Sequence, residues 1–378
     1  MYGYKTLSLL LACTTFASAA DVPPPINKYP TLSPKVYDLP PQFHSFVSTS
    51  KRVKALYGPF NLTSKLTPTP ASIATKEIGL TALYFDIILP CKTCYLIAAS
   101  GSAEYENGTI ADLNTGISLH HFTTDVYGKG RHRTPCTSQS SEILFTFGNE
   151  RTPTVFSDIV DKRYMSAFPI SENETFPVRL ALQNFNDKDV QVYTTLAVEY
   201  VEGAMPKDWL RQRSIWLDNG NCTQYPAVPV PKDTTKFYLQ SQKWVAEFDG
   251  ELLGAGGHIH SGGHLVEIYQ NEKVVCASKA VYEQKAAGDG MGHSMRSRRD
   301  EEGAMVKRHE PDKAKEGSWF IKSMTTCSNM GKVKKGDVFY KKSHYDLEKY
   351  YGMKNPDGSW MEVEGVAVIS VALEQGGK

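Results

Sequence analysis

The sequence predicts an all-β protein made of two consecutive jelly-roll-like β-sandwich domains with disulfides. Its 378 residues include 20 Tyr, 16 Phe and 21 Pro, a composition that favours strands over helices. Short β-branched or aromatic segments recur between Gly, Asn and Pro turns, which is the pattern of a sandwich. A Pro-rich stretch at 218–234 divides these segments into two groups. A hydrophobic content of 41% excludes wholesale disorder.

The N-terminal segment 1–19 has the features of a secretory signal peptide. Lys5 supplies its positive charge, an apolar run follows at 7–16, and residues 17–19 form a small-residue cleavage site. Residues 20–54 are a Pro-rich N-terminal arm that we expect to lie extended along the surface. The sequence therefore predicts a secreted, extracellular protein.

The first sandwich is predicted over residues 55–217. Its expected strands are 80–88, 95–99, 116–124, 143–147, 178–185 and 190–201, and a short helix is expected at 204–213. Residues 218–234, which contain Pro226, Pro229 and Pro231, are interpreted as a linker between the domains. This part of the chain carries the pair His120-His121.

The second sandwich is predicted over residues 235–375. Its expected strands are 236–248, 254–269, 273–282, 318–325, 337–344 and 363–373. Residues 285–317 interrupt them and lack apolar periodicity, so we interpret them as a disordered insertion. The dibasic pairs at 298–299 and 307–308 leave two alternatives open, cleavage by a secretory-pathway protease or an uncut surface loop.

Glycosylation and cysteine patterns agree with export. Four N-x-[S/T] sequons predict N-glycans at Asn61, Asn107, Asn173 and Asn221. Removal of the signal peptide leaves six cysteines, Cys91, Cys94, Cys136, Cys222, Cys276 and Cys327. An even number in an exported chain predicts three disulfides, with the pairing open. The Cys91-x-x-Cys94 spacing also occurs in redox and zinc motifs, but it has neither a βαβ context nor a second CxxC here.

Charge and hydropathy exclude two classes of partner. Lys+Arg is 42 and Asp+Glu is 41, and loss of the signal peptide removes one positive charge, which leaves a formal charge of zero. A neutral chain without basic runs does not fit a nucleic-acid binder, because such binding depends on neutralising phosphates. No apolar run beyond the signal peptide reaches about 18 residues, so no membrane span is expected.

Two histidine pairs are the candidate functional residues. His258 and His260 form an H-x-H within a Gly-rich strand, and residues two apart on a strand point to the same face. Both imidazoles can therefore reach one metal ion. His120 and His121 are adjacent, so they need a twist, a bulge or different ring nitrogens to do the same. Imidazole-rich sites suit copper, with zinc as the alternative.

The arrangement resembles a known group of copper proteins. The segments 117–121 (ISLHH), 148–152 (GNERT) and 256–263 (GGHIHSGG) resemble secreted proteins that carry the stress up-regulated nodulin domain. That family is related to peptidylglycine alpha-hydroxylating and dopamine beta-monooxygenase-type copper proteins. The resemblance covers roughly residues 55–375, and 256–263 is its most specific part.

The resemblance implies two copper sites with altered ligands. His120 and His121 match the pair on the electron-donating copper, whose third ligand is a His where this chain has Asn184. His258 and His260 match the pair on the oxygen-activating copper, whose third ligand is a Met. Met361 is the nearest methionine, but strand register places Glu364 there, and a carboxylate favours Cu(II) or zinc over Cu(I).

Two functional hypotheses follow from the resemblance. The first is a copper-monooxygenase-like protein that binds one or two copper ions and hydroxylates an unknown substrate with O2, with ascorbate or a similar reductant as electron donor. Peptide amidation does not fit, because Gly256 replaces the Arg that clamps the peptide carboxylate. The second is a non-catalytic, extracellular metal-binding or stress-related protein that retains the fold. The substitutions at Asn184, Gly256 and Glu364 weigh toward this second hypothesis.

Overall fold

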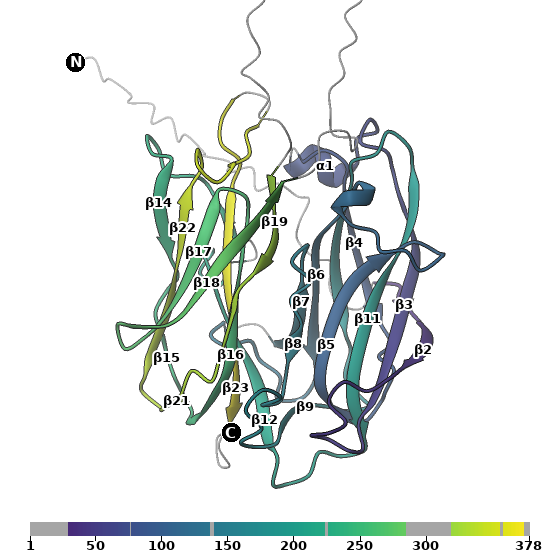
Figure 1. Ribbon diagram of the computed structural model, residues 1–378, viewed down its shortest axis with the longest axis vertical. Helices are drawn as coiled ribbons and strands as arrows, with labels where there is room; N and C mark the ends of the chain where they lie inside the picture. The colour runs from purple at the N-terminus through teal and green to yellow at the C-terminus, as the bar shows by residue number, and fades with distance from the viewer. Residues whose placement is uncertain are drawn as a thin grey trace, which may run out of the picture.

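The computed structural model describes residues 29–75, 77–136, 140–223, 226–284, 319–355 and 358–373. Within these ranges the chain is almost entirely β, as predicted, with one short α-helix, α1 (Pro70–Thr75), and a 3-10 turn at Leu113–Thr115. Two β-sandwiches stand side by side, the N-terminal one in purple to teal and the C-terminal one in green to yellow (Figure 1). The expected signal peptide and the insertion 285–317 lie outside the described residues.

The first sandwich packs a five-stranded sheet against one half of a larger sheet. The five-stranded sheet has the order β1-β4-β10-β6-β7, and the facing strands have the order β2-β3-β11-β5-β9. The strands of the first sheet are β1 (Thr31–Leu32), β4 (Leu80–Ile87), β10 (Pro177–Asn184), β6 (Ile117–Tyr127) and β7 (Ser141–Phe147). Those of the facing layer are β2 (Lys35–Leu39), β3 (Lys51–Leu62), β11 (Val190–Glu202), β5 (Cys94–Glu104) and β9 (Ser166–Ile170), with β8 (Thr154–Val155) paired to β5.

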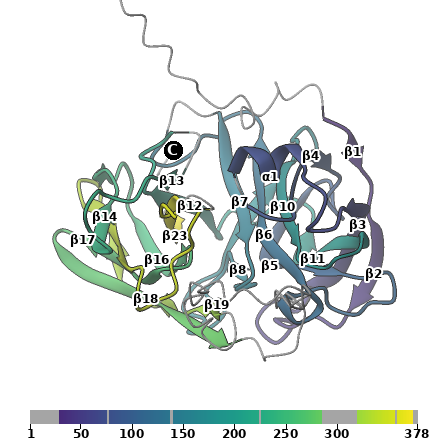
Figure 2. The same cartoon turned by 90° about the horizontal axis from the view of Figure 1, so that it is seen from above.

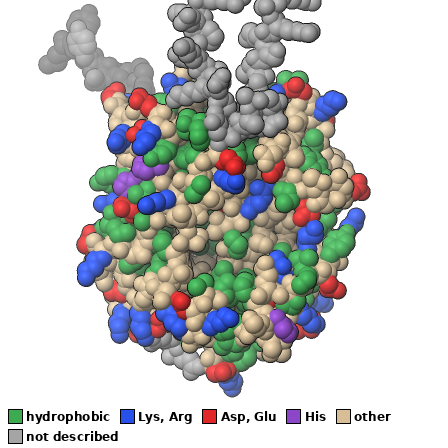
Figure 3. All heavy atoms as spheres, in the orientation of Figure 1, with side chains coloured by type: hydrophobic (Ala, Val, Ile, Leu, Met, Phe, Trp, Pro, Cys, Tyr) green, Lys and Arg blue, Asp and Glu red, His purple; other side chains and the backbone are tan. Residues whose placement is uncertain are grey.

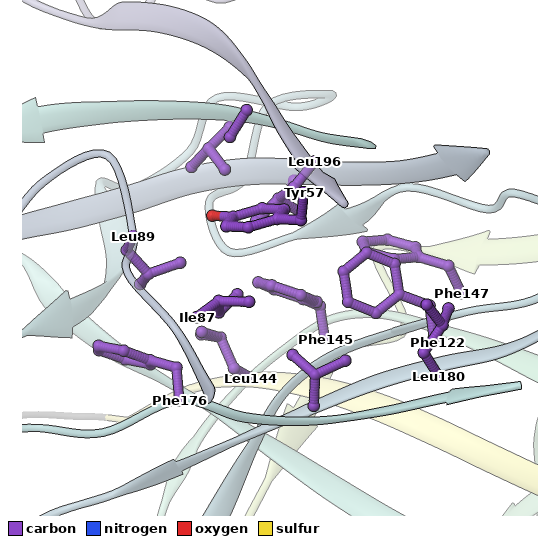
Figure 4. Packing of buried hydrophobic residues seen from close by; sticks show 14 of the residues in the cluster. Tyr57, Ile87, Leu89, Phe122, Leu144, Phe145, Phe147, Phe176, Leu180 and Leu196 are labelled. Atoms are coloured by element: carbon purple, nitrogen blue, oxygen red, sulfur yellow. The ribbon is translucent and has the colours of Figure 1, made fainter. Parts of the chain in front are cut away.

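Aromatic side chains fill the first core. Tyr57 on β3 lies across from Phe145 and Phe147 on β7 and Phe122 on β6, and all four are at most 2% exposed (Figure 4). Full burial of a side chain of this size contributes about 1.5–3 kcal/mol. This packing fixes the position of β6, the strand that carries His120 and His121.

The second sandwich repeats the two-layer arrangement. Strands β12, β23, β16 and β20 form one layer, which continues the larger sheet, and the facing sheet has the order β14-β22-β17-β18-β19. The first layer consists of β12 (Leu210–Asp218), β23 (Val363–Leu373), β16 (Gly250–Ile259) and β20 (Thr326–Ser328), with β13 (Ala227–Val228) and β21 (Lys332–Val333) at its edges. The facing layer consists of β14 (Lys236–Gln240), β22 (Val338–Asp346), β17 (Gly263–Gln270), β18 (Lys273–Gln284) and β19 (Trp319–Met324), with β15 (Trp244–Val245) paired to β22.

The expected helix at 204–213 is wrong. Strand β12 begins at Leu210, and it pairs along its length with β23, from Arg211 opposite Leu373 to Asp218 opposite Val366. Tertiary pairing overrides the local preference here, because the strand buries its apolar side chains in the second core. A two-residue parallel contact between β12 and β9 joins the sheets of the two sandwiches.

Three disulfides form, as the cysteine count predicts. Cys91 pairs with Cys94, Cys136 with Cys222 and Cys276 with Cys327. The second disulfide connects a loop of the first sandwich to the segment that follows β12, and so it ties the two halves together. The third joins β18 to β20.

The surface is mixed in charge and presents the predicted sequons. On the face drawn in Figure 3, positive and negative side chains are interspersed. The four sequon asparagines, Asn61, Asn107, Asn173 and Asn221, are exposed, as attachment of a glycan requires. Within the part of the chain that the structure describes, no helix is long and apolar enough to cross a membrane.

Candidate metal centre

The two histidine pairs meet between the sandwiches. Strands β6 and β7 lie on the side of the first sandwich that faces β12, β16 and β23, as the view from above shows (Figure 2). His120 and His121 project from β6, His258 lies near the end of β16, and His260 follows it directly. Each sandwich therefore contributes one pair.

A bulge resolves the geometry of the adjacent pair. On β10, Ala181 pairs with His121 and Leu182 with Leu119, so the register shifts and His120 has no partner of its own. The extra residue of a bulge re-aims the side chains beside it. The two rings consequently lie together, with their Nδ1 atoms 3.1 Å apart.

The second pair is positioned by a turn that ends β16. The expectation of one strand over 254–269 is wrong, because Gly262 has φ of 93° and starts a new strand, β17, at Gly263. His264 therefore lies on β17, where it stacks on Tyr350, and does not share the face of His258 and His260.

Strand β23 brings a carboxylate to the histidines. It pairs antiparallel with β16, so that His258 lies opposite Val366 and Ile259 opposite Gly365. The backbone N–H of His260 donates to the carbonyl of Glu364 at 2.9 Å. This register places the Glu364 side chain beside both imidazoles of the H-x-H.

Four side chains form a compact set of possible metal ligands. One ligand atom from each of His121, His258, His260 and Glu364 lies within 4.8 Å of the others. The Nε2 atoms of His121 and His258 are 3.3 Å apart. A Glu364 carboxylate oxygen lies 3.6 Å from Nε2 of His121 and 3.9 Å from Nε2 of His258, and the other oxygen lies 3.5 Å from Nε2 of His260. We call these four residues the central cluster.

Two further carboxylates hold the outer nitrogens of the rings. Glu150 contacts Nδ1 of His258 at 2.9 Å, which leaves Nε2 of that ring directed into the central cluster. Glu77 contacts Nε2 of His120 at 3.1 Å, and His120 in turn contacts Nδ1 of His121. Partners of this kind fix the tautomer and orientation of metal-binding imidazoles.

The protonation states follow from these contacts. Burial would lower the pKa of His258, but the charge of Glu150 and the hydrogen bond to it outweigh burial and raise that pKa to about 9. The pKa of His120 is raised because Glu77 outweighs burial in the same way. Burial, and then the neighbouring histidine charges, lower the pKa values of His121 and His260 well below the usual value, so these rings are neutral donors.

The pKa values of the two carboxylates Glu364 and Glu150 are shifted in opposite directions. Burial raises the pKa of Glu364, although the charges of His258 and His120 oppose it. For Glu150 burial acts in the same sense, but the charge and hydrogen bond of His258 outweigh it and lower the pKa. Glu150 is therefore the anionic partner of His258, and Glu364 is a buried carboxyl group that lacks a full counter-charge.

The donor set fits a metal ion. Nε2 of His260 is buried and has no hydrogen-bond partner among the described residues, which is costly for a polar atom unless a ligand satisfies it. Two nitrogens held tetrahedrally at ~2.0 Å from one ion lie about 3.3 Å apart, and this matches the separation between Nε2 of His121 and Nε2 of His258. Three imidazoles and one carboxylate suit copper or zinc.

The remaining predicted ligands lie elsewhere or play a different part. Nδ2 of Asn184 donates to the carbonyls of Thr63 and Lys188, and its Oδ1 accepts from Asn186, so its amide is occupied by backbone and loop contacts. Met361 precedes β23, and Glu364 is the residue from this segment that supplies oxygen atoms to the central cluster. His120 contacts the cluster through His121, while Glu77 occupies its Nε2.

The sequence analysis did not single out Glu77 and Glu150. Glu150 belongs to the segment 148–152 that carries the family resemblance, and its place in that segment was the available signal. Glu77 follows α1 and has no motif around it, so the fold alone brings it to His120.

The geometry also changes the relation between the two pairs. The resemblance implies one copper for each pair, held in separate sandwiches. In the structure His121 and His258 are in direct contact, and the ring centroids of His121 and His260 are 5.5 Å apart. The two pairs thus form one cluster.

Comparison with known proteins finds two distant sequence relatives. No family model matches the chain. Over 311 residues it is 26% identical to a protein of Phoma sp. named probable copper-dependent oxygenase M1, with 80% of this chain and 72% of that protein covered. Over 273 residues it is 27% identical to a protein of Cochliobolus lunatus named probable copper-dependent oxygenase clz3, with 72% and 77% covered.

Similarity to solved structures is weak. The structure of PNGF-II matches with a TM-score of 0.38 at 10% identity, over 78% of this chain and 60% of that one. PNGase F, a glycosylasparaginase from Flavobacterium meningosepticum, matches with a TM-score of 0.36 at 10% identity, over 85% and 96%. We draw nothing further from these two. The two sequence relatives, at 26% and 27% identity, are distant homologues of this chain that are named probable copper-dependent oxygenases.

Proposed function

We propose that this protein is a secreted, copper-dependent oxygenase that holds a single copper ion in the central cluster. The observation that carries the proposal is the convergence of His121, His258, His260 and Glu364 from both sandwiches into one set of ligand atoms. The names of the distant homologues support copper over zinc. The three disulfides are consistent with an extracellular location.

Each residue has a role that follows from its contacts. His121, His258 and His260 supply three Nε2 donors, and Glu364 supplies an oxygen donor whose negative charge is buried beside them. Glu150 holds the ring of His258, and Glu77 acts on His121 through His120. A bound copper ion would supply one-electron redox chemistry and reactivity toward O2.

The chain also determines which nitrogen of His258 carries a proton. At neutral pH the His258–Glu150 pair holds a proton, because the pKa of His258 is about 9. Binding of a metal at Nε2 of His258 requires a free lone pair there, so the remaining ring proton must lie on Nδ1, where Glu150 accepts its hydrogen bond. Glu150 thereby selects the ring tautomer that binds metal.

The side chains around the cluster leave it partly open. His121, His258 and His260 have side-chain exposures of 26%, 18% and 14%, whereas Glu364 is 6% exposed. A substrate and O2 can approach from the histidine side, while the carboxylate lies beneath. We propose oxidation of an organic substrate at this opening, with an external reductant such as ascorbate.

The alternative is a metal-binding protein without catalysis, and Glu364 favours it. A carboxylate stabilises the divalent state relative to Cu(I) and so opposes redox cycling. Both candidates require the same single site. They differ in whether a reductant drives the consumption of O2.

Metal stoichiometry tests the proposal. The secreted protein is stripped with a chelator, titrated with Cu(II), and followed by elemental analysis and electron paramagnetic resonance. We expect one copper per chain, lost in His121→Ala and in His260→Ala. His344→Ala is the matched control, because His344 contacts Glu267 at 2.8 Å and lies outside the cluster.

The outcomes separate the candidates. Two coppers per chain, or the loss of a different copper in each of the two variants, would show two separate metal centres and refute the proposal. One copper with ascorbate-dependent O2 uptake that His260→Ala abolishes supports the oxygenase. One copper without such uptake favours metal binding alone.

A further inference from the structure

A lysine is buried in the core of the second sandwich. Lys341 lies on β22 with its side chain turned inward, and it is 0% exposed. Its Nζ donates to Oδ1 of Asn219 and, at 2.8 Å, to Oγ of Ser343. Both acceptors are neutral. A buried ammonium group held only by neutral groups is costly, so such a lysine calls for an explanation.

The partner Asn219 is fixed at both ends of its amide group. It follows β12 directly and is 7% exposed. Its Nδ2 donates to the hydroxyl of Tyr345 at 3.1 Å while its Oδ1 accepts from Lys341. The amide is thus held in one orientation, and its carbonyl carbon lies next to the lysine amine.

The surroundings favour the neutral, nucleophilic form of the amine. Burial lowers the pKa of Lys341 to about 7, and the negative charges of Asp218 and Glu364 only partly oppose this. A substantial fraction of the amine is therefore uncharged at neutral pH. An uncharged amine beside a carbonyl carbon, with water excluded, is the arrangement required for nucleophilic attack.

A carboxyl group is available for proton transfer. Asp218 precedes Asn219 in the chain and is buried. One of its oxygens accepts from Nε1 of Trp216 at 2.7 Å, and the other is buried without a hydrogen-bond partner among the described residues. The negative charge of Asp218 acts on Lys341 without a direct ion pair, and we assign to this carboxylate the transfer of the proton to the leaving nitrogen.

We propose that Lys341 and Asn219 form an intramolecular isopeptide bond. The Nζ–Cγ bond forms and the Cγ–Nδ2 bond of Asn219 breaks, so that the side-chain nitrogen of Asn219 leaves as ammonia. The lysine ammonium and the carboxamide become a secondary amide and an ammonium ion, and charge and protons balance. No oxidant, reductant or metal is consumed. The reaction goes beyond the proposed function and does not depend on it.

The cross-link would act as a staple within the second sandwich. It joins the end of β12 to β22, residues that are 122 positions apart in the chain. A covalent closure of a long loop restricts the unfolded chain, as a disulfide does, but a reductant cannot open it. The expected result is resistance to unfolding that persists after reduction of the three disulfides.

Peptide mapping tests the proposal on the full chain as purified. The protein is denatured, reduced, alkylated, digested with trypsin and analysed by tandem mass spectrometry. We expect a branched peptide in which the segment containing Asn219 is joined to the segment containing Lys341, at the summed mass less one ammonia. Trypsin should fail to cleave after Lys341, because its side chain carries no charge once acylated.

One side reaction needs a control. Asn219 precedes Gly220, and an Asn-Gly sequence also loses ammonia when it forms a succinimide. Lys341→Met keeps the length and the buried position of the side chain, and it leaves succinimide formation possible. Asn219→Ala removes both reactions. Asp218→Asn should lower the cross-linked fraction without changing either reacting group.

The outcomes are decisive. A branched peptide in the wild type that is absent in Lys341→Met establishes the bond. Separate, unmodified peptides in the folded wild type refute it, whether or not the variants fold. Loss of ammonia from Asn219 in the wild type without a branched peptide shows a succinimide and likewise refutes the isopeptide. Copper content is irrelevant to each of these results, so a failure here leaves the metal proposal untouched.

Discussion

The contact between Glu150 and His258 makes a quantitative prediction for the metal-free protein. Burial alone would keep His258 neutral, but Glu150 raises its pKa from the ordinary 6.5 to about 9. A difference of about 2.5 pH units at about 1.4 kcal/mol per unit corresponds to about 3–4 kcal/mol. Glu150→Gln keeps the shape of the side chain and removes its charge. We therefore expect the variant to be about 3–4 kcal/mol less stable near pH 6.5.

The sign of the pH dependence is fixed by the direction of the change. The pKa of His258 is higher in the folded protein than in the unfolded chain, so the folded protein retains its proton over a wider range. The stabilisation is complete below about pH 6.5, and it is lost as the pH rises through about 9. Denaturant unfolding of the chelator-treated wild type and of Glu150→Gln, at intervals between pH 6 and 10, measures the difference directly.

A matched variant controls for loss of a carboxylate in general. Glu267→Gln removes an acid that contacts His344 at a similarly short distance, 2.8 Å, at a more exposed site. Solvent screens that pair, so its removal should cost less than about 1 kcal/mol. If the difference between the wild type and Glu150→Gln stayed constant from pH 6.5 to 10, the proton would not reside on His258, and the assignment of Glu150 as its partner would be wrong.

Three further perturbations follow from the same geometry. Copper must displace the proton held on His258, so the apparent affinity measured with a competing chelator should rise about tenfold per pH unit up to about pH 9. Glu142→Gln removes a fully buried carboxylate that contacts Arg211 at 2.7 Å. We expect thermal unfolding to show that this variant is about 3–5 kcal/mol less stable than the wild type. Gly365→Ala places a methyl group against the hydroxyl of Ser343, beside Glu364 of the central cluster, and should reduce the copper bound per chain without preventing secretion.

The fold class was predictable because its signals are local. Short β-branched and aromatic segments between turn residues specify strands wherever they pair, and they filled two sandwich cores as expected. The failures have tertiary causes. The segment 204–213 became a turn and the start of β12, because pairing with β23 outweighs the preference of a few residues. The boundaries of the predicted domains stay predictions, although β12 already contributes Ile215 and Leu217 to the second core.

The candidate site likewise has one part that local spacing predicts and one part that depends on tertiary packing. The i, i+2 rule for strands predicts that His258 and His260 share a face. Glu364 was expected beside them only because the resemblance places the third ligand of that pair at its position, and the pairing of β16 with β23 brings it there. The meeting of His121 with His258 depends on how two sandwiches dock, which no local pattern encodes. Glu77 reaches His120 for the same reason. The assignment of these residues as metal ligands stays a prediction until metal is measured.

The docking of the sandwiches is itself determined at the opposite end of their interface. Val126, five residues beyond His121 on β6, pairs with Glu142 of β7, and Glu142 contacts Arg211 and lies 3.8 Å from Arg213, both on β12.

Arg211 and Arg213 pair with the far end of β23, the strand whose first residues include Glu364. Strands β6 and β23 therefore contribute His121 and Glu364 to the central cluster at one end, and at the other end they pair with β7 and β12, the strands that carry Glu142, Arg211 and Arg213. We therefore expect a change in the ion network to alter the distance between His121 and His258. Mutations in the ion network should consequently change the affinity for metal more than they change the packing of either sandwich core.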